Sequence, residues 1–496
     1  MIEVFLEGHD YSYEVLDILS SYFDRETIQF VYEKDPADSR SLFIHSSMAF
    51  DAGDVVFKCV VRHGDANVTE EKRFSRAGGG EQEMRKQYKR MLKNNLLTAL
   101  EAFTGKKMPW GILTGIRPVK VVHKLLDQGF SEEDIQDRLT GFYRLSVDKA
   151  KLCLEIAAVE RKYILPYDDR KVSVYISIPF CPTRCSYCSF PSHEVGKWGH
   201  LADEYLNCLY EEMDSVYNKL AGAGYSIQTV YIGGGTPTVL NHAQLKDLLE
   251  QVNRCFVSGE TKEFTVEAGR PDTLDREKLS MLKAAGVTRI SINPQSMNSA
   301  TLERIGRRHT PEEVVRAYDL ARSTGHSNIN MDIIIGLPGE DIDMVVKTLD
   351  AALTLKPEGL TVHTLAIKRA SRLNEQGGDM GWVEEDEISG MVEAAAYYAG
   401  KMGMKPYYLY KQRYMVGNHE NIGYSLPGYE CLYNMQIMEE KQSIIGLGAG
   451  AVSKLVFLKE DRLERLENIK NVEYYISRFG HVMGKKLSGL AALIDG

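Results

Sequence analysis

The chain has 496 residues, of which 44% are hydrophobic and 26% charged, and its formal net charge is −9. This length predicts at least two domains, and the composition is that of a globular protein. The negative charge argues against broad nucleic-acid binding as the main task, and no apolar run approaches the ~20 residues that span a bilayer. The N-terminal segment lacks the basic and apolar regions of a signal peptide, which predicts a cytoplasmic location.

The first part of the chain, residues 1–105, is predicted to be an α+β domain. Its expected elements are strands near 28–32, 42–45 and 55–61 and a helix at about 81–103. The helix is rich in basic residues that recur at helical spacing, which favours a solvated face over a contact with RNA or another anionic partner. These residues are Arg85, Lys86, Lys89, Arg90 and Lys93.

Residues 106–170 are predicted to form a helical connector that ends in a linker at 164–169. From residue 171 onward, β-branched runs alternate with amphipathic segments of helix length, which is the pattern of a parallel βα repeat. The expected strands are 172–178, 228–233, 263–268, 288–293, 329–335 and 359–364. The expected helices between them are 201–222, 242–255, 275–285, 311–325 and 341–355.

Six successive βα units predict an α/β fold with a partial (β/α)6 barrel of the TIM type over residues 171–385. A fully wound open sheet is the alternative. Residues 386–496 are predicted to be a small C-terminal extension that covers the substrate, with helices at about 386–402 and 471–483.

Three of the eight cysteines, Cys181, Cys185 and Cys188, follow the first of these strands with the spacing C-x3-C-x2-C. In a reduced cytosolic chain such a cluster points to metal rather than to disulfides. Three thiolates can hold three corners of a [4Fe–4S] cube and leave one iron open for a ligand. A zinc site that uses His193 as its fourth ligand is the alternative. The five single cysteines are expected to be buried.

Further candidate residues follow the later strands, whose C-terminal ends carry the site in βα barrels. Gly233-Gly234-Gly235 after the second strand lets the backbone approach a ligand closely, although such a triplet is often a plain turn. Glu267 at the end of the third strand can hold an ammonium group or ribose hydroxyls.

Gln295 ends the fourth strand, and Arg307, twelve residues on, can pair bidentately with a carboxylate. Asp332 lies inside an apolar fifth strand, where an ionisable residue is costly unless it is paired or used. Each of these residues alone is also explained by a surface charge or a core hydrogen bond. Their shared place at successive strand ends favours one site.

Residues 171–455 resemble the oxygen-independent coproporphyrinogen III oxidases (coproporphyrinogen dehydrogenases) of the radical S-adenosylmethionine (SAM) superfamily. The segments that carry the resemblance are 175–188, 233–238, 332–339 and 446–453, with Gln295 and Arg307-Arg308-His309. Residues 109–118 and 408–413 resemble the long HemZ-type branch of this family.

The resemblance implies a [4Fe–4S] cluster on Cys181, Cys185 and Cys188, and it implies one or two bound SAM molecules. Tyr175 and these three cysteines are the implied catalytic residues. The residues implied to contact SAM are Tyr175, Tyr187, Gly234, Gly235, Thr236, Glu267, Gln295, Arg307, Asp332, Ala366 and Val452.

The implied reaction is an oxidoreductase step of haem biosynthesis. A radical derived from SAM takes a hydrogen atom from the β-carbon of a propionate, and loss of CO2 and one electron leaves a vinyl group. Two such steps convert coproporphyrinogen III into protoporphyrinogen IX, with a low-potential electron donor such as flavodoxin or ferredoxin. The four substrate carboxylates call for cations, and the candidates are Arg308, Lys368, Arg369, Lys411 and Arg413, each of which is alternatively a solvated charge.

Two residues beside the cysteines depart from the best-known oxidases. Ser177 stands where those enzymes have a histidine, and Phe190 makes the loop resemble the haem-chaperone branch. The alternatives are therefore a haem-binding or haem-transfer protein, and a radical SAM methyltransferase or haem-degrading enzyme that acts on a tetrapyrrole.

Overall fold

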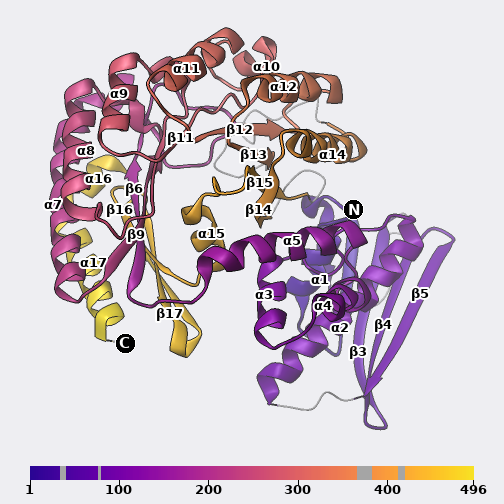
Figure 1. Cartoon of the computed structure of the whole chain (residues 1–496). Coiled ribbons are helices and arrows are strands. Elements are labelled where there is room, and N and C mark those ends of the chain that lie inside the picture. Colours follow the sequence, from indigo (N-terminus) through magenta and orange to yellow (C-terminus); the bar gives the residue numbers. More distant parts are fainter. Residues whose placement is uncertain (34–40, 76–79, 366–382, 412–418, 496) are drawn as a thin grey trace. The chain divides into compact units, whose positions relative to one another are not determined.

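The structure is a computed structural model that describes residues 1–33, 41–75, 80–365, 383–411 and 419–495. The chain divides into two compact units, Met1–Glu155 and Ile156–Gly496 (Figure 1). Each unit contains a sheet of its own. The boundaries expected at residues 105, 170 and 385 stay predictions.

The first unit is an α+β domain with a five-stranded sheet in the order β2-β1-β3-β4-β5. Strand β1 runs parallel to both of its neighbours, and β3, β4 and β5 are antiparallel. The strands are β1 (Ile2–Glu7), β2 (Ile28–Val31), β3 (Leu42–Asp51), β4 (Asp54–His63) and β5 (Ala66–Ser75). The first and the last of these strands along the chain, β1 and β5, were not expected from the sequence.

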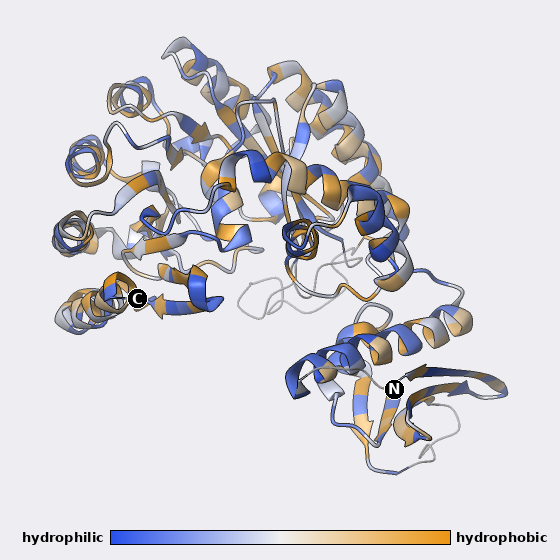
Figure 2. Cartoon of the chain, turned by 60° about the horizontal axis from the view of Figure 1, so that its bottom comes forward, coloured by the Kyte–Doolittle hydropathy of each residue, from blue (hydrophilic) through white to orange (hydrophobic). Residues whose placement is uncertain are grey.

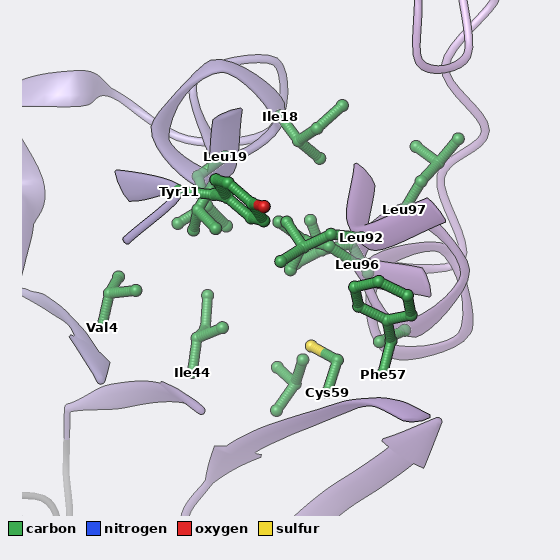
Figure 3. Close-up of a cluster of buried hydrophobic side chains, with 14 of the residues drawn as sticks. Val4, Tyr11, Ile18, Leu19, Ile44, Phe57, Cys59, Leu92, Leu96 and Leu97 are labelled. Carbon is green, nitrogen blue, oxygen red and sulfur yellow. The ribbon is translucent and has the colours of Figure 1, made fainter. Parts of the chain in front are cut away.

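Alternation along the strands builds the core of this unit. In β4, Phe57, Cys59 and Val61 are buried while Lys58 is exposed, because successive side chains point to opposite faces of a sheet. Helices α1 (Ser12–Leu19) and α2 (Glu81–Thr104) pack their leucines against these residues (Figure 3). Gly105 ends α2 in the left-handed conformation (φ +73°), where glycine avoids the strain of a Cβ atom.

The basic face of α2 forms ion pairs with acidic residues in and next to α1. Arg85 pairs with Asp10 at 3.0 Å, Lys93 pairs with Asp17 at 3.3 Å, and Lys89 pairs with Glu14 between them. The expected solvated face is therefore wrong for Lys89 and Lys93, whose charges are used inside the unit. This pairing also removes most of the basis for a nucleic-acid contact.

Three further helices complete the part of the chain before the second sheet. They are α3 (Val119–Asp127), α4 (Glu132–Asp137) and α5 (Val147–Ile164). Residues 106–170 are thus mainly helical, as expected.

The second unit contains six parallel strands that are neighbours in chain order. They are β6 (Lys171–Ile178), β9 (Ser226–Gly234), β10 (Glu263–Glu267), β11 (Arg289–Ser291), β12 (Ile329–Ile335) and β13 (Gly359–Thr364). The helices between them are α7 (Ala202–Gly222), α8 (His242–Phe256), α9 (Arg276–Ala284), α10 (Ser299–Arg304), α11 (Pro311–Ser323) and α12 (Ile342–Leu355). The predicted βα alternation is confirmed, and the two short helices α6 (Val195–Trp198) and α10 were not expected.

The chain is thus a mixed α/β protein. Among the described residues, β6 and β13 do not pair, so hydrogen bonds do not close the six strands into a ring. The partial barrel stays a prediction.

The C-terminal residues extend both edges of this sheet. Strands β14 (Lys405–Tyr410) and β15 (Asn421–Ser425) join antiparallel beside β13. Strand β16 (Ser443–Leu447) runs parallel to β6, and β17 (Val452–Phe457) and β18 (Arg462–Glu467) follow it. The sequence did not indicate that β16 and β6, far apart in the chain, lie side by side.

In the described part of the C-terminal region, four helices accompany these strands. They are α14 (Glu385–Lys401), α15 (Leu432–Glu439), α16 (Val472–Ser477) and α17 (Phe479–Asp495). The single helix expected at 471–483 is wrong, because the backbone leaves the helical conformation at Arg478 (φ −115°, ψ 24°) and a second helix follows.

The helices carry both hydrophilic and hydrophobic residues (Figure 2), as expected for helices that bury one side. Within the described ranges, the chain has no helix that is both long and apolar enough to cross a membrane.

Candidate functional site

The three clustered cysteines line one small cavity at the C-terminal end of β6. Cys185 is buried, and Cys181 and Cys188 are partly buried. The cavity has a volume of about 80 Å³. Its other lining residues are Thr183, Tyr187, Ser192, Gly235, Thr236, Glu267, Gly269, Arg270, Asn293 and Arg307. The structure therefore brings together eight of the predicted site residues in this cavity. They are the three cysteines, Tyr187 on the same loop, Gly235, Thr236, Glu267 and Arg307.

The cysteine loop, residues 181–188, is held by the turn that follows α10. The amide of Ser186 donates to the carbonyl of Ile305 at 3.0 Å, and the Thr183 hydroxyl donates to the carbonyl of Gly306 at 3.2 Å. Cys188 N–H donates to the Cys185 carbonyl at 3.2 Å, which folds the loop back on itself. These hydrogen bonds fix the shape of the cysteine loop.

The glycine triplet after β9 makes room for this loop. A Cβ on Gly235 would lie 2.5 Å from the carbonyl oxygen of Phe180 and 3.0 Å from Cys181 Sγ. Gly234 has φ +108°, and its Cβ would lie 2.9 Å from Ser177 Oγ. Thr236 donates its hydroxyl to Cys181 Sγ at 3.5 Å. The glycines therefore admit another part of the protein, and their approach to a ligand stays a prediction.

Arg307 is buried and is engaged by protein groups. Its Nη2 donates to the Tyr187 hydroxyl at 3.0 Å, and its Nη1 donates to the Asn293 and Gly269 carbonyls at 3.1 and 3.3 Å. Its Nε has no hydrogen-bond partner among the described residues. The expected bidentate pairing of Arg307 with a carboxylate stays a prediction.

Glu267 and a stack of tyrosines lie beside the cavity. Tyr231 donates its hydroxyl to Glu267 Oε1 at 2.7 Å. The Tyr231 ring stacks on Tyr433 with centroids 4.5 Å apart, and Tyr175 stacks on both at 6.1 and 6.0 Å. Burial raises the pKa of Glu267 to about 7, and the nearby Asp332 charge acts in the same direction. Tyr175 thus lies in an aromatic stack rather than on the wall of the cysteine cavity.

Stability of the cofactor-free protein is expected to fall with pH because of Glu267. A carboxyl whose folded-state pKa lies near 7, above the ordinary value of ~4.3, contributes stability that is complete below about pH 4 and lost as pH rises through 7. The loss is at most about 4 kcal/mol. Thermal unfolding of the wild type and Glu267→Gln at pH 5.5 and 8 measures it. Equal pH slopes in the two proteins would contradict the assignment.

Gln295 and Asp332 lie next to each other at the ends of neighbouring strands. Gln295 N–H donates to the Asp332 carbonyl at 3.0 Å, and Gln295 has φ +64°, a conformation that costs free energy for a residue with a Cβ atom. Its side-chain Oε1 is buried with no hydrogen-bond partner among the described residues. Backbone strain together with a buried, unpartnered acceptor is typical of a residue at a ligand-binding site.

The carboxylate of Asp332 is partly buried and paired. Asn330 donates to its Oδ1 at 2.7 Å, and His363 Nε2 lies 3.9 Å from its Oδ2. Burial by itself raises the pKa of Asp332, but His363 and Asn330 outweigh it and hold the pKa below its usual value. Asp332 is therefore ionised at neutral pH.

The glycine-rich turn after β16 lies beside the end of β6. Gly446 is the register partner of Tyr175, and Ser177 donates its hydroxyl to the carbonyl of Ala449 at 2.9 Å. Val452 begins β17, directly after this turn. Ser177, which stands where the best-known oxidases have a histidine, thus joins two segments of the site.

A fully buried ion pair holds the same turn from behind. Glu212 of α7 lies 3.4 Å from Lys486 of α17, and the two side chains are 0% and 1% exposed. Glu212 accepts from Gly448 N–H at 2.8 Å, and Lys486 donates to the Gly446 carbonyl. The sequence alone did not identify either residue.

The substrate-binding candidates are only partly described. Arg308 is exposed and lines a second cavity, of about 670 Å³, which shares Thr183 and Arg307 with the cysteine cavity. Lys411 is buried at the end of β14, and the neighbouring Tyr407 is only 1% exposed, which leaves that ring little surface for a macrocycle. Ala366, Lys368, Arg369 and Arg413 lie outside the described residues.

Arg270 is a site residue that the sequence did not single out. It follows β10 and lies beside Cys185 in the wall of the cysteine cavity. The C-terminal ends of parallel strands carry the site in such folds. The position of Arg270 three residues after Glu267, just past the end of β10, could therefore have identified it from the sequence.

The donor set fits an iron–sulfur cluster. Three sulfur atoms face one cavity, and the described lining contains no fourth cysteine and no histidine. His193 is instead directed to the Pro179 carbonyl, with Nδ1 3.4 Å from that oxygen, which weakens the four-ligand zinc alternative. Soft thiolate ligands with one open position are typical of a [4Fe–4S] cluster that binds a further ligand.

Comparisons with known proteins agree with this chemistry. The model of the radical SAM superfamily matches residues 175–352, which contain the cysteine loop, so fold and site define a radical SAM protein. Over 84% of this chain and 83% of the relative, 42% of the residues are identical to the oxygen-independent coproporphyrinogen-III oxidase-like protein HemZ of Bacillus subtilis. The chain therefore belongs to the radical SAM superfamily and, within it, to the HemZ-type branch of the coproporphyrinogen III oxidase-like proteins.

More distant relatives include the heme chaperone HemW of Bacillus subtilis, which is 34% identical over 56% of this chain and 70% of its own length. The structure of coproporphyrinogen III oxidase HemN from Escherichia coli, at 22% identity, matches 66% of this chain and 72% of its own with a TM-score of 0.52. That likeness shows a shared fold.

Proposed function

We propose that Cys181, Cys185 and Cys188 hold a [4Fe–4S] cluster whose open iron binds SAM. The observation that carries the proposal is the single cavity lined by these three thiols. When bound, the cluster supplies the electron that cleaves SAM and starts radical chemistry. The residues proposed to surround SAM are Tyr175, Tyr187, Gly234, Gly235, Thr236, Glu267, Gln295, Arg307, Asp332, Ala366 and Val452.

Polar groups of this chain supply the contacts that a SAM molecule needs. Ionised Asp332 attracts its cationic groups, and the carboxyl oxygens of Asp332 and Glu267 accept from ribose hydroxyls. The unpartnered Oε1 of Gln295 accepts a further hydrogen bond. Arg307 braces Tyr187, which precedes the last cysteine, and so orients the loop.

We further propose that the substrate is a tetrapyrrole and that the reaction is the oxidative decarboxylation of two propionates of coproporphyrinogen III. The 42% identity to a relative named as oxidase-like supports this proposal. The substrate carboxylates require cations, for which the exposed Arg308 is one described candidate and Lys411 another. A flavodoxin-like or ferredoxin-like electron donor and a cytoplasmic location belong to the same proposal.

A haem-transfer role is the second candidate. Phe190, two residues after Cys188, is 63% exposed and thus offers a flat apolar surface beside the cluster loop. Several relatives of this chain are named heme chaperones.

Anaerobic product analysis separates these functions. The reconstituted protein is incubated with coproporphyrinogen III, SAM and a low-potential reductant, with Cys185→Ala as control. Vinyl products support the oxidase, and stoichiometric haem binding without turnover supports the chaperone. A methylated product with S-adenosylhomocysteine supports the methyltransferase. SAM cleavage without any consumption of coproporphyrinogen would contradict the oxidase while leaving the radical SAM chemistry standing.

A further inference from the structure

Arg270 is a buried arginine in direct contact with the cysteine loop. Its side chain is 4% exposed. Its Nη1 lies 3.8 Å from Cys185 Sγ, within hydrogen-bond range for sulfur, and donates to the Thr183 hydroxyl at 3.2 Å. One guanidinium nitrogen thus touches both a cluster ligand and the loop residue two positions before it.

Asp272 fixes the orientation of this guanidinium. Arg270 Nε donates to Asp272 Oδ1 and Arg270 Nη2 donates to Oδ2, both at 2.9 Å. Two parallel bonds between planar groups leave little rotational freedom, so the remaining nitrogen, Nη1, is directed at Cys185. The pair lies in the short segment after β10, at the C-terminal ends of the parallel strands.

A positive charge at this place acts on the redox chemistry of the site. A cubane held by three thiolates is anionic and becomes more negative when it accepts an electron. A nearby guanidinium stabilises the reduced form more than the oxidised form, and N–H···S hydrogen bonds act in the same direction. Because Arg270 is buried, solvent screens this interaction little.

We propose that Arg270, oriented by Asp272, stabilises the reduced form of the cluster and thereby sets its reduction potential. Arg270 acts through Cys185, so it is a positioning residue. The inference rests on the cluster-binding part of the proposed function.

A redox titration of the reconstituted full-length protein, followed by electron paramagnetic resonance, tests the proposal. Arg270→Gln removes the charge, and we expect the ratio of reduced to oxidised cluster at the wild-type midpoint to fall about tenfold, which is 59 mV for a one-electron couple. Asp272→Asn keeps the side-chain shape and one acceptor oxygen for Arg270 but removes the opposing charge, so it is expected to shift the midpoint in the opposite direction. Arg270→Lys keeps the charge and is expected to shift it less than Arg270→Gln.

Opposite signs separate an electrostatic role from general damage to the loop. Shifts of the same sign, or unchanged midpoints in Arg270→Gln and Asp272→Asn, would overturn the proposal. If Arg270→Gln does not load the cluster, Asp272→Asn and Arg270→Lys decide. The matched control is Arg322→Gln. It breaks an ion pair with Glu358, which directly precedes β13 and so lies at the N-terminal ends of the parallel strands, away from the cysteine loop. We expect it to leave the midpoint unchanged. A wild type without a cluster would contradict the proposed function itself.

Discussion

Replacement of Cys185 by alanine is expected to abolish binding of the iron–sulfur cluster and, with it, cleavage of SAM. Cys185 is one of only three thiols in the described lining of the cavity, and it is buried between Arg270 and the Ile305 turn. The loss should exceed the roughly 10- to 100-fold effect of removing an outer-shell partner, because a ligand itself is lost. Iron and sulfide analysis and the yield of 5′-deoxyadenosine measure it.

Cys255→Ala is the matched control for this experiment. Cys255 is a buried cysteine of the same unit, but it lies on α8 and contacts Asp214 rather than the cluster loop. We expect its iron content to equal that of the wild type. A Cys185→Ala protein that still holds a full [4Fe–4S] cluster would show that the ligand assignment is wrong.

Replacement of Glu212 by glutamine is expected to have the largest effect on folding stability. The amide keeps the shape of the side chain and its contacts with Gly448 and Tyr475, but it leaves the ammonium group of Lys486 buried without its counter-charge. Burial already lowers the pKa of Lys486, and Glu212 opposes that shift. Breaking a buried pair on one side costs about 3–5 kcal/mol. Thermal unfolding of the variant and the wild type measures this cost.

The double variant Glu212→Gln with Lys486→Met removes both charges and keeps the hydrogen bond to Gly448. We expect it to recover most of the lost stability, because neutral replacement of a buried pair is often nearly neutral. If Glu212→Gln alone melts at the wild-type temperature, the pair does not hold the turn in the way described.

The features that the sequence predicted are local ones. The three cysteines lie within one short loop after a strand. The conformation of that loop alone therefore brings their sulfur atoms to one cavity. The six parallel strands of the second unit were each expected within a few residues, because β-branched runs and helical periodicity repeat over short windows. Glu267 was found at a strand end for the same reason. The substrate remained open, because the departures at Ser177 and Phe190 are single residues whose surroundings a sequence does not display.

Other features depend on residues that are far apart in the chain. The sequence placed basic residues on one face of α2 but did not show that Glu14 and Asp17 lie opposite Lys89 and Lys93. It likewise did not pair Glu212 with Lys486 or place Arg270 beside Cys185.

By itself, then, the sequence identified the radical SAM family of this protein and the βα order of its second sheet. Only the tertiary structure decided which charges lie around the cysteine loop and which turn lies beside Ser177. The physical reason is that the periodicity of a strand or helix depends on residues that are close together in the sequence. Contacts such as Ser177 with Ala449 arise only when the sheet brings β16 beside β6.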